Sequence, residues 1–174
     1  MTREELEDIV KRYMDSFTTM TLASCTDKKP GVAAVYYARH GFDLVFFSSP
    51  RSIHASMFAQ NPIAAAEIHG EYERWQEIKG LQMEGRVEKI VSPVSLALYT
   101  TTYLRRYPFV RELFSTSAAQ AADITAQMSR VGMYVFRPES IRYLDNQGGF
   151  GNRWKLDIVD GKAIGNPVRD GKSL

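Results

Sequence analysis

The chain has 174 residues, of which 44% are hydrophobic and 24% charged, and this composition suits one globular domain with a sizeable core. Its 22 basic and 20 acidic side chains leave a formal net charge of +2, which is too balanced to indicate nucleic acid or an anionic membrane as a partner. The single cysteine, Cys25, excludes an internal disulfide, and no apolar run approaches the ~18 residues of a membrane span.

The N-terminal part of the sequence predicts one helix followed by three strands. Residues 3–15 carry apolar side chains at helical spacing, which indicates an amphipathic helix. Strand-like runs follow at 18–25, 32–38 and 43–49, and the short turns between them are typical of an antiparallel meander. Cys25 lies in the first run and is expected to be a buried small hydrophobe. The acidic start does not resemble a signal peptide, which favours a cytoplasmic protein.

The next segments predict a short helix and two more strands. The helix is expected at 52–60, because Asn61 and Pro62 would end it, and the strands at 63–70 and 76–91. Within the longer strand, strict alternation places Gly80 and Gln82 on one face. Gly80 and Gly85 suggest bulges or close approach of the backbone.

The C-terminal part predicts further helices and a final strand region. Helical segments are expected at 93–107, 109–116 and 121–128. Residues 133–146 predict either a strand pair or one bent strand, interrupted at Arg137-Pro138. The tail, 146–174, is expected to be loop-rich, with a small hairpin around Asp160-Gly161. We therefore expect one α+β domain over 1–174, mainly β, with a barrel at about 18–145 and peripheral helices.

One short stretch, FFSSPRSIHASMFAQNP at 46–62, combines hydroxyl, guanidinium and imidazole groups at a strand-to-helix junction. Backbone amides at a helix N-terminus, serine hydroxyls and Arg51 could form a cradle for a phosphate. The alternative is that a serine caps the helix and Arg51 is a solvated surface charge.

Other chemical motifs are weak. The three histidines, His40, His54 and His69, show no metal-binding spacing, so no metal site is expected. The glycine-rich GGFG at 148–151 has no helix predicted behind it and indicates a tight loop better than a dinucleotide site.

The order of these elements resembles the pyridoxamine 5′-phosphate oxidase-like, FMN-binding split-barrel superfamily. The resemblance covers roughly residues 15–145 and rests on PGVAAVYYARHGFDLVFFSS, RSIHASMFAQNP and IKGLQMEGRVEKI in succession. The later IRYLDNQGGFGNRW resembles an uncharacterised branch that carries a C-terminal DN…GFG segment. The resemblance implies a six- to seven-stranded antiparallel split β-barrel.

The resemblance also implies a cofactor site. FMN would lie at the interface of a homodimer, with its phosphate bound by the third strand and the next helix, at Ser48, Ser49, Arg51, Ser52 and His54. The isoalloxazine ring would contact the backbone of Ala34, Val35 and Tyr36, with Gln82 as the contact from the fifth strand. Phe150, Arg153 and Trp154 would close over the flavin as a mobile, glycine-hinged lid.

Two departures from the family pattern bear on function. The family commonly has a lysine where His54 stands, and the oxidase itself has an Arg-Gln pair where this chain has Lys79 and Gly80. The resemblance therefore favours an FMN-dependent oxidoreductase acting on an unidentified small molecule, without nucleic-acid, membrane or metal partners. The alternatives are a non-enzymatic flavin-binding or electron-carrier protein, and a split barrel that binds a deazaflavin or haem, with His40 or His69 as the haem ligand.

Overall fold

The computed structural model describes residues 1–110 and 131–169, and most of the helical segments expected between 109 and 128 lie outside these residues. The helices are α1 (Arg3–Ser16), α2 (Ile53–Gln60) and α3 (Pro93–Arg106), with short 3-10 turns η1 (Trp75–Glu77) and η2 (Asn146–Gly148). The strands are β1 (Thr19–Thr26), β2 (Lys29–Tyr36), β3 (Ala38–His40), β4 (Asp43–Ser48), β5 (Ile63–His69), β6 (Lys79–Lys89), β7 (Gly132–Asp145), β8 (Arg153–Val159) and β9 (Lys162–Arg169).

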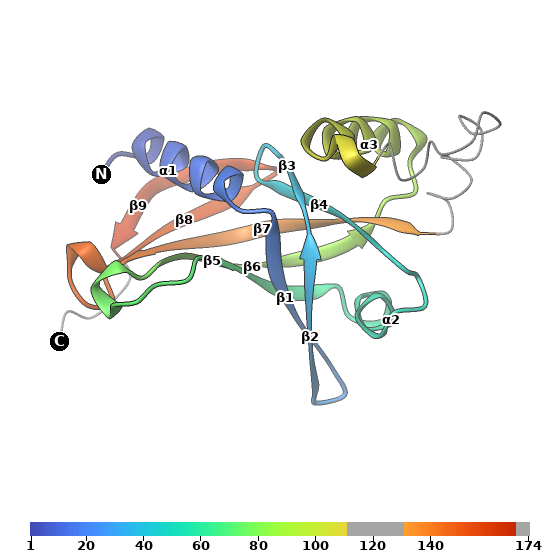
Figure 1. The fold of residues 1–174 in the computed structure, drawn as a ribbon, viewed down its shortest axis with the longest axis horizontal. Coiled ribbons are helices and arrows are strands. Elements are labelled where there is room, and N and C mark those ends of the chain that lie inside the picture. The colour runs from blue at the N-terminus through green and yellow to red at the C-terminus, as the bar shows by residue number, and fades with distance from the viewer. Residues whose placement is uncertain (111–130, 170–174) are drawn as a thin grey trace.

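The strands form one curved, antiparallel sheet in the order β2-β1-β5-β6-β7-β4-β3, and β8 and β9 extend it from β7 (Figure 1). The chain turns from β2 into β3 at the buried Tyr37, so the two ends of the row approach each other. The mainly antiparallel α+β barrel expected from the sequence is therefore confirmed. The number of described strands reaches nine, because β3 is a short strand after β2 and the tail adds β8 and β9.

The barrel splits along β7, which changes partners partway. Residues 132–136 pair with β4, whereas residues 140–144 pair with β8. Along the other edge of β7, which pairs with β6, the register shifts between Glu84 and Gly85 of β6. A Cβ atom at Gly85 would lie 2.1 Å from the carbonyl oxygen of Arg137, so only glycine fits this bulge. Of the two alternatives for this region, the single bent strand is confirmed.

The prediction of a loop-rich tail is wrong. β8 and β9 form a hairpin that turns at Asp160 and Gly161, both with positive φ, and the turn itself was expected. Leu156 and Ile158 are buried in the barrel core. β8 is stable there because the second half of β7 leaves an edge that β4 does not cover.

The prediction that Cys25 is buried is also wrong, since Cys25 is exposed. β1 alternates regularly, with Met20, Leu22 and Ser24 facing inward. Cys25 therefore belongs to the opposite face of the strand.

Two helices cover different sides of the barrel. Helix α1 begins with a capping box between Thr2 and Glu5, and its inward positions, Leu6, Val10 and Met14, join the main core. Tyr99 and Tyr103 of helix α3 and its C-cap residue Tyr107 form a second cluster with Ala38, Val45, Met133 and Val135. These two layers leave the outward face of β1, β2, β5 and β6 uncovered by any described helix (Figure 1).

Candidate functional site

Polar side chains converge where β4 leads into α2. The Ser48 hydroxyl lies 3.1 Å from the hydroxyl of Ser52 and 2.5 Å from Nε2 of His54. Ser52 caps α2, since its hydroxyl accepts a hydrogen bond from the Ala55 amide at 3.2 Å. The structure thus brings together three of the residues predicted to bind a phosphate.

Ser49 and Arg51 complete this turn. The Arg51 amide donates to the Ser49 hydroxyl at 3.2 Å, and the Ser52 amide donates to the Ser49 carbonyl at 3.0 Å. The Arg51 side chain is exposed and forms no hydrogen bond or ion pair with the described residues. Its guanidinium is therefore available to an anion at the start of α2.

The imidazole of His54 is partly withdrawn from solvent. Burial lowers its pKa, because the charged form loses hydration. The neutral ring can either donate to or accept from Ser48, according to its tautomer. Arg51 is consequently the only fixed positive charge among residues 48–54.

A polar row crosses the outward face of the sheet. Thr21 on β1 lies opposite Glu67 on β5, Glu67 opposite Gln82 on β6, Gln82 opposite Arg142 on β7, and Arg142 opposite Lys155 on β8. Side chains directly opposite one another share a face, so five strands contribute to one surface. This arrangement places the predicted Gln82 at the centre of the row.

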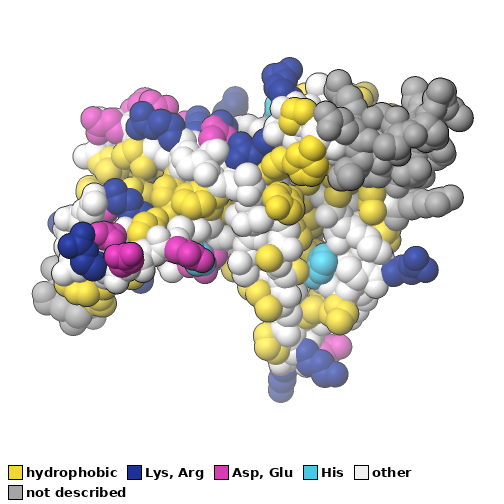
Figure 2. Space-filling view, viewed as in Figure 1, with side chains coloured by type: hydrophobic (Ala, Val, Ile, Leu, Met, Phe, Trp, Pro, Cys, Tyr) yellow, Lys and Arg dark blue, Asp and Glu magenta, His cyan; other side chains and the backbone are white. Residues whose placement is uncertain are grey.

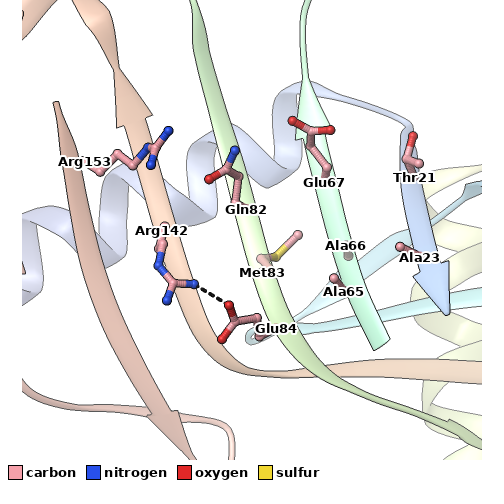
Figure 3. Close-up of a pocket in the computed structure, with 10 residues that line it drawn as sticks. All are labelled: Thr21, Ala23, Ala65, Ala66, Glu67, Gln82, Met83, Glu84, Arg142 and Arg153. Atoms are coloured by element: carbon pink, nitrogen blue, oxygen red, sulfur yellow. Dashed lines mark hydrogen bonds and ion pairs between the residues drawn. The ribbon is translucent and has the colours of Figure 1, made fainter. Parts of the chain in front are cut away.

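A shallow pocket of about 470 Å³ lies on this face (Figure 3). Ala23 and Ala65, whose side chains are small, leave the room for it. Arg142 and Arg153 lie on one side of Gln82, and Glu67 and Thr21 on the other (Figure 3). The complete lining is Thr21, Ala23, Ala65, Ala66, Glu67, Gln82, Met83, Glu84, Arg142 and Arg153.

The two arginines of this pocket differ in their partners. Arg142 forms an ion pair with Glu84 at 2.8 Å. The Nε atom of Arg153 is buried and has no hydrogen-bond partner among the described residues. A buried donor without a partner is costly, so Arg153 is the residue of this pocket most in need of an added acceptor.

His69 stands on the same outward face, two residues beyond Glu67 on β5. Its Nδ1 lies 3.0 Å from the carbonyl oxygen of Gly70 and donates to it, since a carbonyl oxygen only accepts, and its Nε2 forms no hydrogen bond with the described residues. Gly80 lies opposite His69 and carries no side chain to crowd it.

The remaining predicted residues are spread over different faces. Ala34 lies opposite Thr21 on the outward face, and Tyr36 is 54% exposed, whereas Val35 points into the core. Trp154 also packs against the core, so it lies on the opposite face from Gln82.

Phe150 instead packs on Trp75 of η1, with ring centroids 5.5 Å apart. The glycine turn that carries Phe150 is held by Asn146, whose side chain accepts from the Gly151 amide and donates to the Trp75 carbonyl. Phe150 therefore contacts Trp75 while Trp154 packs on the core, and the closure of these residues over a flavin stays a prediction.

Sequence reasoning named Arg153 but did not find the other charged residues near Gln82 on this face. Glu67 on β5 lies far along the chain from Arg142 and Lys155, which are on the consecutive strands β7 and β8, so no local motif joins the three. Strand alternation did predict that Gly80 and Gln82 share one face of β6, and the same reasoning applied to β5 and β7 could have grouped Glu67 and Arg142.

The described residues contain neither a metal-binding cluster nor a membrane-spanning helix. Among residues 1–110 and 131–169, no group of three histidine, cysteine or acidic side chains could hold a metal ion. Within the same ranges, no helix has both the length and the apolar character needed to span a bilayer.

No protein-family model matches the sequence, and no relative with a curated description matches it. Several solved structures, in contrast, are similar to the structure of this chain. A haem-binding protein from Mycobacterium smegmatis aligns with a TM-score of 0.66 and 18% identity over 87% of this chain, which spans 57% of that protein.

Two other similar structures have chains of comparable length. An FAD-binding protein from Mesorhizobium loti aligns with a TM-score of 0.59 and 16% identity, over 75% of this chain and 88% of its own. A candidate pyridoxamine 5′-phosphate oxidase from Listeria innocua aligns with a TM-score of 0.60 and 15% identity, over 80% of this chain and 98% of its own. Such identities establish the shared fold and leave the ligand to the side chains of this chain.

Proposed function

From its split-barrel fold, shared with pyridoxamine 5′-phosphate oxidase-like proteins, we propose that this chain binds FMN and acts as a flavin-dependent oxidoreductase on a small molecule. The observation that carries the proposal is the convergence of Ser48, Ser52 and His54 beside Arg51, whose side chain has no partner among the described residues. Three hydroxyl or imidazole groups and one guanidinium match the acceptors and the charge of a phosphate.

The residues predicted to bind the phosphate can supply its hydrogen bonds, although they carry only one fixed positive charge. Ser48 and Ser52 can turn their hydroxyl protons toward an acceptor, and Ser52 can still cap α2 with its lone pair. Neutral His54 can donate one hydrogen bond, so Arg51 carries the charge compensation that the family commonly shares with a lysine.

The ring of the flavin would extend from this turn toward the outward sheet face. β2 contacts β4, and Ala34 on β2 lies opposite Thr21 at the edge of the sheet-face pocket. The flavin supplies the hydride and electron transfer when it is bound. The chain would orient the ring with Gln82 and offer the Arg153 Nε donor to a ring carbonyl.

A second copy of this chain would cover the same face, which gives the homodimer expected from the resemblance. Val32, Tyr36 and Ile63 are 74%, 54% and 64% exposed, an unusual amount for apolar side chains on strands of a sheet. Figure 2 shows hydrophobic side chains along the part of the surface that β2 occupies in Figure 1.

The charges of this face are arranged for such self-association. β5 and β6 carry Glu67 and Glu84, whereas β7 and β8 carry Arg142 and Lys155. A two-fold axis along β6 would set β5 of one copy against β7 of the other, so Glu67 of one copy would face Arg142 of the other. A monomer at micromolar concentration in light scattering would contradict this part of the proposal.

Haem is a second candidate, favoured by the geometry of His69. An imidazole that donates through Nδ1 to a backbone carbonyl is the usual form of a metal-binding histidine, and His69 does so with Gly70. Arg153 on the same face could pair with a propionate. When bound, haem would supply an iron centre for ligand or electron chemistry.

An absorption spectrum separates the candidates. We expect the purified protein to be yellow, or to become so when FMN is added, and Arg51→Ala to weaken FMN binding. A protein that takes up haemin instead, and loses it in His69→Ala, would support the haem alternative. A protein that takes up neither would refute both. A yellow protein that turns over no donor–acceptor pair would support an electron carrier.

A further inference from the structure

A second pocket, of about 360 Å³, opens beside α2 at the end of the barrel. Ala55, Phe58 and Ala59 of α2, Pro50 of the preceding loop and Val87 of β6 give it mainly apolar walls. Since a helix turns about 100° per residue, Ala59 projects some 140° away from His54, whereas the Phe58 ring lies 6.1 Å from the His54 ring. The pocket therefore borders the Ser48–His54 cluster and extends away from it. Mouths of β-barrels are common sites for small ligands.

The hydroxyl of Tyr134, which also lines this pocket, has no hydrogen-bond partner among the described residues. Tyr134 is only 5% exposed, and its ring stacks on Phe46 at 5.6 Å. Gly132 makes room for this position, because a Cβ atom there would lie 2.8 Å from the tyrosine ring. Burial raises the pKa of Tyr134, so its hydroxyl remains a donor at neutral pH.

Lys89 supplies the charge of the pocket. It lies opposite Tyr134 in the sheet, lines the same pocket and forms no ion pair with the described residues. No acidic side chain lines the pocket among the described residues, and the only other polar side chain there is Ser56. An anionic group would therefore meet a cation and an unpaired donor side by side.

We propose that this pocket binds a small monocarboxylate with a compact apolar body. The carboxylate accepts a hydrogen bond from the Tyr134 hydroxyl and faces the Lys89 ammonium, while the apolar body lies against Ala55, Phe58 and Val87. A single carboxylate suits a site with one cation. The pocket borders the proposed flavin-phosphate cluster through Pro50 and Phe58, but none of the five residues assigned to the phosphate lines it.

Phenylacetate is a suitable probe, followed by amide chemical shifts of the ¹⁵N-labelled full chain. We expect saturable shifts at Ala59 and Val87, and weaker binding of the neutral analogue phenylacetamide. Tyr134→Phe keeps the ring and removes only the donor, so phenylacetate affinity should fall about three- to tenfold. Lys89→Gln should lower it about two- to fivefold, because the ammonium is exposed.

Two controls keep the test specific. Lys29→Gln removes another exposed lysine, on β2 and outside this pocket, and should leave phenylacetate binding unchanged. Ala59→Leu, at an exposed helix position, should block the pocket without disturbing the core. Equal binding of phenylacetamide, unchanged affinity in Tyr134→Phe, or shifts confined to Ser48 through His54 would each overturn the proposal. The last result would place the anion at the flavin-phosphate cluster instead.

Discussion

Replacing Arg51 by alanine tests the phosphate site most directly. In the ligand-free chain the Arg51 guanidinium is exposed and bonds to no described residue, so its removal should leave the stability of the fold almost unchanged. Any loss of FMN affinity would then report a contact that forms only with the ligand.

The expected loss follows from the kind of contact. A hydrogen bond to a charged group contributes about 1.5–3 kcal/mol, which corresponds to roughly a 10- to 150-fold weaker dissociation constant. Because Arg51 is exposed, solvent competes for the guanidinium, and the lower end of this range applies. The effect should shrink as salt is added, since salt screens exposed charges.

Titration of the quenching of flavin fluorescence measures this affinity for both FMN and riboflavin. Riboflavin lacks the phosphate, so Arg51→Ala should weaken FMN binding and leave riboflavin binding unchanged. Arg12→Ala removes an exposed arginine of α1 and serves as the matched control. Equal losses for the two flavins, or no loss for either, would refute the assignment of Arg51 to the phosphate and leave Ser52 as an ordinary helix cap.

Three further predictions concern the fold and His54. Gly85→Ala should destabilise the protein by about 1–3 kcal/mol in urea unfolding, since its Cβ would collide with the Arg137 carbonyl; wild-type stability would show that β7 can move away. Tyr107→Phe should cost about 1–3 kcal/mol, because the Tyr107 hydroxyl donates to the buried Tyr37 carbonyl at 2.6 Å, and an unchanged unfolding midpoint would contradict this. Burial lowers the pKa of His54 in the folded state, so the unfolded chain binds its proton first as the pH falls through about 6.5. Stability should therefore decline below that pH, and less in His54→Gln; parallel pH profiles of the two proteins would exclude this role.

Much of the fold followed from local patterns. Helical spacing located α1, and Pro62 directly follows the Asn61 that ends α2, so the expected and observed bounds agree closely. The SSPRS segment likewise indicated a capped helix start with clustered hydroxyls, and Ser52 does cap α2. These features depend on neighbours within a few residues, which is why sequence alone could find them.

The errors arose where distant segments decide the outcome. The tail contains few strong strand signals at its end, and β8 exists because the bent β7 offers it a free edge. Cys25 lies in an apolar run, yet the inward positions of β1 belong to Met20, Leu22 and Ser24. Local composition does not determine which face of a strand is covered.

The sequence by itself determined the order of helices and strands, the cap at Ser52 and the grouping of polar residues 48–54. Only the tertiary structure decided that Gln82 shares a surface with Glu67 and Arg142, and that Trp154 turns away from it. The physical reason is that caps and turns form between near neighbours in the chain. A sheet face, in contrast, joins residues through pairings between strands that the sequence separates by tens of positions.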